Sequence, residues 1–194
     1  FVSRGLGDVY KRQNKYTFGR NTQAIADIIN IKKVKSSVVI GHDCRNNSRE
    51  LSFEVANIFS ANNIKVFIFD SLKPTPLISY AVRQLDCICG IVLTASHNPP
   101  EYNGYKVYWE DGGQIVPPID KEIIEKINKT DYSNIKFSPK NDLIKILNKN
   151  IEEEFKKLSI KTARIGNSDR SKLKVVFTAL HGTSFKLIPD ILKS

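Results

Sequence analysis

The 194-residue sequence has little of several residue types, and each shortage excludes a class of protein. It contains three cysteines, an odd number in a chain too large to need disulfide staples, which favours a reducing compartment. No apolar run approaches the roughly 18 residues of a membrane span, and no charged-then-apolar signal peptide opens the chain. We therefore expect a cytoplasmic protein with no membrane partner.

Methionine is absent from the whole sequence, which starts at Phe1. A complete natural chain with its initiator would contain one, so we expect both ends to be truncated. The first thirteen residues show neither a clear helical nor a clear strand period. We therefore interpret residues 1–13 as a junction that is foreign to the domain that follows.

The composition is that of a globular protein, with 41% hydrophobic and 26% charged residues. The net charge of +10 would attract polyanions, but the lysines are spread along the chain among acidic residues instead of forming a block. This distribution favours a small phosphorylated ligand and makes nucleic acid an unlikely partner. A non-catalytic α/β module that binds anions or nucleic acid is the alternative, and the charge alone supports it.

The three cysteines are Cys44, Cys87 and Cys89. None of them forms the paired C-x-x-C spacing of a zinc site, so we do not expect a metal at these groups or at the three histidines. Cys87 and Cys89 lie two apart in an apolar run. Residues two apart in a strand point to the same face, so both thiols are predicted to enter the core together.

Apolar residues recur at helical spacing in some segments and in short β-branched runs in others. The predicted order is a helix over 21–34, a strand over 38–40, a helix after 47, a strand over 65–69, a helix after 76 and a strand over 87–93. Asn47 and Glu50 resemble a capping pair for the second helix. Such alternation predicts the α/β class, with a three-layer α/β/α domain and a mixed, mostly parallel sheet.

The mixed character of the sheet comes from an expected hairpin. The turn signal Asp111-Gly112 lies between two strand-like stretches, Tyr105–Trp109 and Gln114–Val116. These stretches are predicted to pair at one edge of the sheet.

Domain boundaries follow from the rest of the pattern. Residues 118–130 are predicted to be a helix and the Lys- and Asn-rich stretch 131–142 a loop. We assign residues 14–148 to the first domain. Residues 149–194 are expected to form a linker helix and the first elements of a second, similar domain, with a strand over 174–177 and then a helix from Thr183.

A polar loop follows the predicted strand over 87–93 and reads TASHNPPEYNGYK over residues 94–106. In an open α/β sheet, loops at the carboxyl ends of the strands form the ligand crevice. Ser96 lies in this loop close to two prolines, which would hold its hydroxyl in one orientation, as a nucleophile or phosphate carrier requires. The alternative is that the short polar residues only form a hydrogen-bonded turn.

The string over 94–106 resembles the active-serine signature of the α-D-phosphohexomutases, the phosphoglucomutase and phosphomannomutase family. Four further segments resemble parts of the same family: GHDCRNNS at 41–48, KPTP at 73–76, WEDGGQIVPP at 109–118 and VVFTALHGTS at 175–184. The resemblance covers residues 14–194 and implies the N-terminal, active-serine part of such an enzyme.

The resemblance implies an enzyme that interconverts hexose 1-phosphate and hexose 6-phosphate. Ser96 is expected to carry a phosphoryl group, to donate it to the sugar phosphate, and to regain one from the bisphosphate intermediate. The family uses Mg²⁺, which Ser96 would bind through its phosphate, and hexose 1,6-bisphosphate as activator. Which hexose phosphate is the substrate stays open, as does the oligomeric state.

Other site residues also follow from the resemblance. Lys106 matches the lysine of N-G-x-K, a candidate general acid/base that would need a lowered pKa; the alternative is a surface lysine that starts a strand. His97 and Asn98 are expected to border the phosphate. Arg45 either neutralises the phosphoserine, braces the serine loop, or only pairs with Asp43.

Several family motifs are missing. The N-terminal G-T-x-G-x-R-G loop is not recognisable in SRGLGDVYKRQ, and the D-x-D-x-D-R metal loop and the later sugar and phosphate loops are absent. Mg²⁺ needs oxygen ligands such as those carboxylates, so we expect the chain to be inactive alone.

One further residue, His181, and one further class of enzyme, the serine hydrolases, remain to be considered. His181 matches the family's T-x-L-H-G turn, and we expect its role to be structural. A serine hydrolase is rejected, because the adjacent Ser96 and His97 are not expected to form the hydrogen bond of a catalytic triad and no G-x-S-x-G elbow is present.

Overall fold

The computed structural model describes residues 14–32, 37–163 and 172–193. Its helices are α1 (Lys15–Lys32), α2 (Ser48–Ala61), α3 (Thr75–Gln84), α4 (Ile119–Lys129), α5 (Asn150–Thr162) and α6 (Leu187–Leu192). Its strands are β1 (Ser37–His42), β2 (Lys65–Ile68), β3 (Cys89–Leu93), β4 (Tyr105–Trp109) and β5 (Ile144–Ile146), with short 3-10 turns at Tyr132–Asn134 and Asn141–Leu143. Residues 1–13, which the sequence suggested to be foreign, lie outside the described residues.

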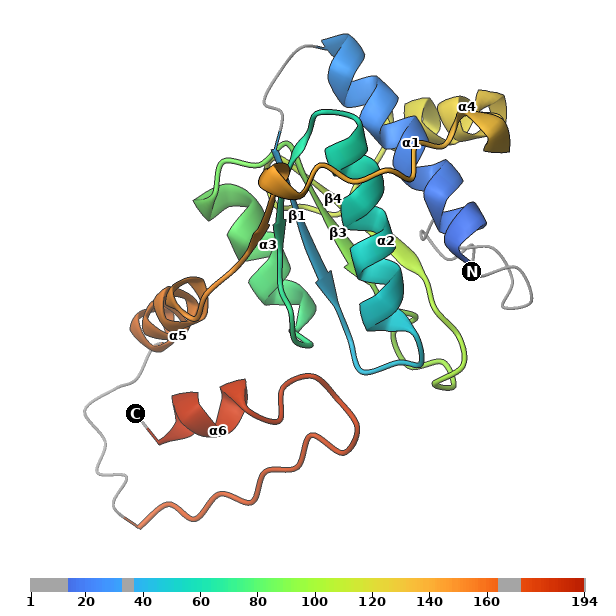
Figure 1. The fold of residues 1–194 in the computed structure, drawn as a ribbon. Coiled ribbons are helices and arrows are strands. Elements are labelled where there is room, and N and C mark those ends of the chain that lie inside the picture. Colours follow the sequence, from blue (N-terminus) through green and yellow to red (C-terminus); the bar gives the residue numbers. More distant parts are fainter. Residues whose placement is uncertain (1–13, 33–36, 164–171, 194) are drawn as a thin grey trace.

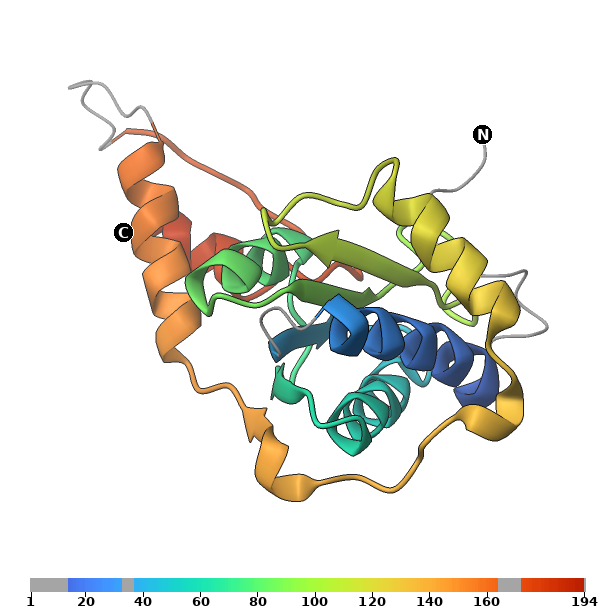
Figure 2. The same ribbon diagram turned by 90° about the horizontal axis from the view of Figure 1, so that it is seen from above.

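The five strands form one sheet in the order β4-β3-β1-β2-β5. β1 pairs in parallel with β2 and β3, and β2 with β5, while β4 runs antiparallel to β3. Helices α1, α2 and α4 cover one face of the sheet, and α3 and α5 cover the other (Figures 1 and 2). The predicted three-layer α/β/α domain with a mixed, mostly parallel sheet is therefore confirmed.

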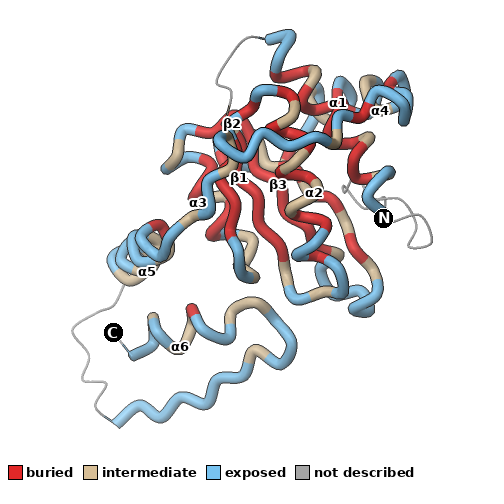
Figure 3. The backbone as a smooth tube through the Cα atoms, in the orientation of Figure 1, coloured by how far each residue is buried: buried red, intermediate tan, exposed pale blue. Residues whose placement is uncertain are grey.

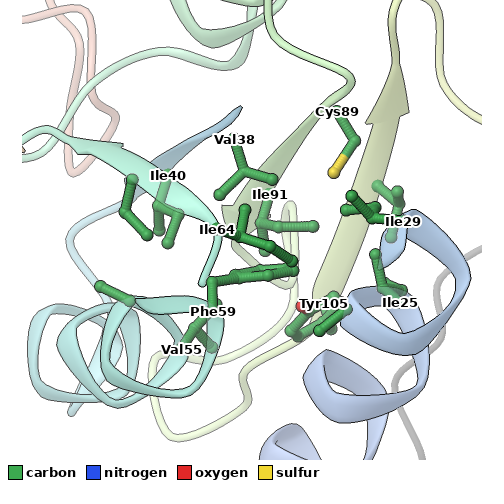
Figure 4. Close-up of a cluster of buried hydrophobic side chains, with 14 of the residues drawn as sticks. Ile25, Ile29, Val38, Ile40, Val55, Phe59, Ile64, Cys89, Ile91 and Tyr105 are labelled. Carbon is green, nitrogen blue, oxygen red and sulfur yellow. The ribbon is translucent and has the colours of Figure 1, made fainter. Parts of the chain in front are cut away.

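The core is divided between the two faces of the sheet. Val38 and Ile40 of β1 pack toward α1 and α2, whereas Val39 between them packs toward α3. Figure 4 shows the first face, where Ile25 of α1 and Phe59 of α2 meet the side chains of the strands. Helices cover both faces, so every residue of β3 and all of β1 after Ser37 are buried, which is why residues 38–40 and 89–93 contain continuous apolar stretches.

The helix starts differ from the sequence predictions in two places. Helix α1 begins at Lys15 and not near residue 21, because Asn14 accepts the backbone N–H groups of Tyr16 and Thr17 at 2.9 and 3.1 Å. The predicted side-chain cap at Asn47 is wrong. Asn47 adopts a left-handed backbone with φ 60°, and its side chain makes no capping hydrogen bond to α2.

The edge of the sheet also differs from the predicted hairpin. β4 forms as expected, but the returning stretch 114–116 contributes only one bridge, from Tyr108 to Gln114, and is not a strand. Pro117 and Pro118 follow at once, and proline cannot donate to a sheet ladder. On the opposite edge, β5 is a strand that the sequence did not predict.

The expectation that Cys87 and Cys89 point to the same face is wrong. Both are buried, but Cys87 packs with α3 and Cys89 packs with α1 and α2. The strand begins only at Cys89, so the alternation of strand side chains does not extend to Cys87.

The C-terminal segment lacks the strand expected over 174–177. Residues 172–178 are exposed and have no regular structure, and the next helix begins at Leu187 instead of Thr183 (Figure 3). A strand needs neighbours to pair with, and no strand in the described part of the chain lies alongside this segment.

Candidate functional site

The parallel strands β1, β2 and β3 all end at the same edge of the sheet, and polar loops follow each of them. A cavity of about 1120 Å³ lies at this edge. Its walls come from the loop after β1, the loop before α3, the serine loop after β3 and residues 179–185 of the C-terminal segment. The crevice expected at the carboxyl ends of the strands is therefore present.

Ser96 lines this cavity and is exposed. Its backbone has a positive φ of 60°, a conformation that costs a non-glycine residue roughly 1–3 kcal/mol and that clusters at functional sites. The backbone N–H of Ser96 donates to Thr94 Oγ1 at 3.0 Å, and the N–H of Asn98 donates to the Ala95 carbonyl at 3.2 Å. The loop is thus a hydrogen-bonded turn, as the alternative supposed, and it also presents Ser96 to the cavity.

The Ser96 and His97 side chains come closer than the sequence argument allowed. Ser96 Oγ lies 3.4 Å from His97 Nδ1, at the long limit of a hydrogen bond. Among the described residues, no carboxylate makes a hydrogen bond or an ion pair with His97, so the third group of a catalytic triad is missing there.

Arg45 lies beneath the serine loop. Its guanidinium pairs with Asp43 at 2.9 Å, and the Arg45 side chain is only 7% exposed. It also donates hydrogen bonds to carbonyl groups of the serine loop. The sequence left three roles open for Arg45. The structure shows the contacts that two of them require: the ion pair with Asp43 and the hydrogen bonds that hold the serine loop.

A second set of hydrogen bonds joins the same two loops. Buried Ser48 donates to Asn103 Oδ1 at 2.8 Å, and Asn103 Nδ2 donates to the Asn46 carbonyl at 2.6 Å. The Asn46 N–H in turn donates to the Pro100 carbonyl at 3.1 Å. Sequence reasoning missed this network, although polar residues at the ends of neighbouring parallel strands are a signal that could have indicated it.

The structure brings some of the predicted residues together and separates others. Asn98 and His181 line the cavity with Ser96, whereas Lys106 does not. Lys106 lies on β4 opposite Val92 in the register, and Val92 does line the cavity. Lys106 is therefore one strand away from the cavity wall.

Two cavity residues were not assigned from the sequence. Lys73, at the start of the KPTP segment, lines the cavity and forms a largely buried ion pair with Glu152 of α5. Cys44 also lines the cavity, and its Sγ donates to the His181 carbonyl at 2.7 Å. Both residues are in loops that follow parallel strands, which is the positional signal for a ligand site.

The described residues do not hold a divalent cation by themselves. Within residues 14–32, 37–163 and 172–193, no group of three or more His, Cys, Asp or Glu side chains could bind a metal. Hard cations such as Mg²⁺ need several oxygen ligands. The part of the chain that the structure describes does not fit an Mg²⁺ site without ligands from elsewhere.

The fold and the cavity define an α/β/α domain. It presents an exposed serine with a strained backbone beside a cavity at the carboxyl ends of the parallel strands. Residues 3–134 match the family model for phosphoglucomutase/phosphomannomutase, alpha/beta/alpha domain I. This match covers more than half of the chain, so the chain belongs to the phosphoglucomutase/phosphomannomutase family.

Named relatives agree with this assignment. The chain is 38% identical over 192 residues to a phosphoglucomutase of Staphylococcus haemolyticus, covering 97% of this chain and 35% of that protein. It is 37% identical over 194 residues to a phosphoglucomutase of Staphylococcus aureus strain N315, covering 98% and 34%. The chain thus spans about a third of the length of these relatives.

Solved structures show the same fold. A protein of Thermus thermophilus, provisionally assigned as phosphomannomutase, superimposes with a TM-score of 0.69 at 26% identity, over 80% of this chain and 33% of that one. A phosphoglucomutase/phosphomannomutase family protein of Burkholderia thailandensis gives a TM-score of 0.62 at 19% identity, over 80% and 34%, which supports the fold alone. Among the described residues, no helix combines the length and the apolarity needed to cross a membrane.

Proposed function

We propose that the protein containing this chain is a phosphohexomutase that interconverts hexose 1-phosphate and hexose 6-phosphate, with Ser96 as the phosphate carrier. The observation that carries this proposal is the exposed Ser96 on a strained turn beside a cavity at the carboxyl edge of the sheet. Membership in a family whose relatives are named phosphoglucomutase supports it.

In the proposed reaction, the phosphoryl group on Ser96 passes to a free hydroxyl of the sugar phosphate. The resulting bisphosphate then returns its other phosphoryl group to Ser96. His97 and Asn98 line the cavity beside Ser96 and would border the phosphate. Lys106 is the proposed group that takes the proton of the attacking hydroxyl. This role rests on its match to the N-G-x-K motif, since Lys106 lies one strand away from the cavity wall, opposite Val92.

Mg²⁺ and hexose 1,6-bisphosphate are proposed as cofactor and activator of the whole enzyme. Mg²⁺ would neutralise charge on the phosphoserine, with Ser96 contributing only through its phosphate. Among the described residues, no group of three or more His, Cys, Asp or Glu side chains supplies a ligand set for the ion.

The domain limits and the need for further domains are also proposed. Residues 14–148 would form the active-serine domain, and residues 149–194 a linker helix with the start of a second domain. The chain alone is expected to be inactive, since its relatives are about three times as long. A cytoplasmic location stays a prediction. Nucleic-acid binding, the alternative function, rests on charge alone, and no contact of the described residues favours it.

Phosphopeptide mass spectrometry on the full-length protein tests the proposal directly. We expect phosphate on Ser96, and we expect Ser96→Ala to abolish mutase turnover measured with Mg²⁺ and hexose 1,6-bisphosphate. Ser133→Ala, in an exposed 3-10 turn away from the cavity, serves as control and should retain turnover. Phosphate on another residue, or full turnover in Ser96→Ala, would refute the proposal. Turnover by the 194-residue chain alone would refute its predicted inactivity.

A further inference from the structure

We infer that Arg45 and Thr94 are positioning residues that together pin Ser96 in its left-handed backbone conformation, so that Arg45 acts through geometry and not through its charge. The inference rests on the proposed role of Ser96. It separates the roles that the sequence left open for Arg45.

The guanidinium of Arg45 contacts three carbonyl groups of the serine loop. Nη2 donates to the Ser96 carbonyl at 2.5 Å, and Nη1 donates to the carbonyls of Pro99 and Tyr102 at 2.6 and 3.2 Å. A guanidinium has five N–H donors in a fixed planar fork. With the bond from Nε to Asp43, four of the five donors are in use, and one N–H on Nη2 remains.

Asp43 holds the Arg45 guanidinium in place. Asp43 accepts from Arg45 Nε at 2.9 Å and from the Arg45 backbone N–H at 3.0 Å. The Asp43 N–H donates to the Leu93 carbonyl at 3.1 Å, which ties this pair to the last residue of β3. Arg45 therefore connects the rigid ends of β1 and β3 to the tip of the serine loop.

Both backbone polar groups of Ser96 are engaged. Its carbonyl accepts from Arg45, and its N–H donates to Oγ1 of Thr94, a residue that is only 6% exposed. A φ of 60° is unfavourable for serine and persists only where neighbouring groups enforce it. Fixing the peptide groups on both sides of Ser96 also fixes the direction of its Cα–Cβ bond, which limits Oγ to the three staggered χ1 positions about that bond.

The same contacts limit what Arg45 can offer a phosphate. Its charge is already paired with Asp43, and the side chain is 7% exposed. A lysine in its place would keep one positive charge but could not reach three carbonyls in a fixed plane. Lysine keeps the positive charge of Arg45 and glutamine removes it, and neither can make all the carbonyl contacts. Comparing the two variants therefore shows whether Arg45 acts by holding the loop or by its charge.

The test uses the full-length protein with Arg45→Lys, Arg45→Gln and, as matched control, Arg49→Gln. Arg49 is exposed, contacts the Asp70 carbonyl at 3.2 Å and does not line the cavity. We expect both Arg45 variants to lower kcat by about 100-fold, because small displacements of a reacting group have effects of that order. KM should change by less than about threefold, since only transition-state geometry is lost. Arg49→Gln should leave both constants unchanged.

Hydrogen exchange of the Ser96, Asn98 and Tyr102 amides gives a readout that is independent of turnover. We expect exchange to accelerate about tenfold in both Arg45 variants, because the loop loses its brace. If the Arg45 variants do not fold, Thr94→Val and Thr94→Ser test the second contact, the hydrogen bond from the Ser96 N–H to Thr94 Oγ1. Valine should lower kcat at constant KM, whereas serine, which restores the acceptor, should not.

Three results would overturn the inference. The first is near-normal kcat in Arg45→Lys with loss only in Arg45→Gln, which would make charge the function. The second is unchanged loop exchange in both variants. The third is faster amide exchange in the serine loop without loss of kcat. This result would show that holding the loop does not matter for catalysis, and it would leave the mutase proposal intact. Full turnover in Ser96→Ala would instead refute the proposed function.

Discussion

The hydroxyl of Tyr105 on β4 lies 3.0 Å from Thr22 Oγ1 on α1, and both side chains are completely buried. Thr22 Oγ1 also donates to the Phe18 carbonyl at 2.7 Å, so in the neutral state Tyr105 is the donor of the pair. This hydrogen bond joins the first helix to the edge strand that follows the serine loop.

Tyr105→Phe is expected to reduce the free energy of unfolding by about 1 kcal/mol at neutral pH, the usual net contribution of a hydrogen bond. Thr22 keeps its bond to Phe18, so no buried donor is orphaned. Urea denaturation measures the change. Tyr132→Phe, at a position that is 48% exposed, is the control and should behave like the wild type. A loss of equal size in both variants would contradict the prediction.

Tyr105→Phe should also alter how the free energy of unfolding depends on pH. Burial raises the pKa of Tyr105 far above its usual value of 10.0, and the Thr22 hydrogen bond offsets this only in part. Above about pH 10 the unfolded tyrosine loses its proton while the folded one keeps it, so the unfolded state binds fewer protons and stability falls as pH rises. Denaturation between about pH 9 and 11 should show a shallower fall in Tyr105→Phe. An identical slope in both proteins would count against this account.

The three thiols are expected to differ in reactivity. Cys44 is exposed, whereas Cys87 and Cys89 are buried, and burial raises the pKa of the Cys89 thiol. Since the thiolate is the reactive form, a thiol reagent should label one cysteine in the native protein and three in denaturant. Mass spectrometry counts the labels. Cys44→Ser should give none under native conditions, and native labelling of Cys89 would disprove the buried placement.

Gly104→Ala is expected to disturb the base of the serine loop. A Cβ at residue 104 would lie 2.5 Å from the Thr94 carbonyl oxygen, and a backbone atom cannot move aside cheaply. We expect a loss of about 1–3 kcal/mol, typical of overpacking. The Thr94 amide, which donates to the Gly104 carbonyl at 3.0 Å, should exchange faster.

Gly113→Ala is the matched control for this change. The atoms nearest to a Cβ there belong to the carboxylate of the Asp111 side chain, at 3.1 Å or more, and that side chain can move. Its stability should stay close to the wild type. Equal destabilisation by both substitutions would show that the Thr94 contact is not the cause.

An ion pair between Lys73 and Glu152 links α5 to the loop before α3. Their ion pair is largely buried, with side chains 17% and 16% exposed, and Tyr80 and Phe155 pack nearby with ring centroids 5.4 Å apart. Glu152→Gln leaves the buried Lys73 charge without its partner. We expect a loss of about 1–3 kcal/mol and faster amide exchange in α5 than in α2.

An exposed ion pair provides the comparison. Glu125 and Lys129 of α4 are 70% and 71% exposed, and such pairs contribute little because solvent screens them. Glu125→Gln should therefore leave stability nearly unchanged. If Glu152→Gln has no larger effect than Glu125→Gln, α5 does not depend on the Lys73 contact.

Local sequence patterns predicted the regular elements that are buried on a face of the sheet. Each of the runs at 38–40, 65–69 and 87–93 overlaps a strand, although the third strand begins only at Cys89, because apolar β-branched residues fit a sheet covered by helices. Two of the errors occurred where a local pattern depends on distant partners. The stretch over 174–177 has strand composition but no neighbouring strand among the described residues, and β5 is a short edge strand that pairs only through β2.

By itself the sequence determined the alternation of strands and helices and the loop that carries Ser96. The alternation depends on periodicities of two to four residues, and the serine loop is marked by the thirteen-residue string over 94–106, so both are visible along the chain. Only the tertiary structure decided that Arg45 holds that loop, because the hydrogen bonds involved join residues 51 to 57 positions apart. No local pattern records such contacts. They arise when the ends of β1 and β3 are brought side by side in the sheet.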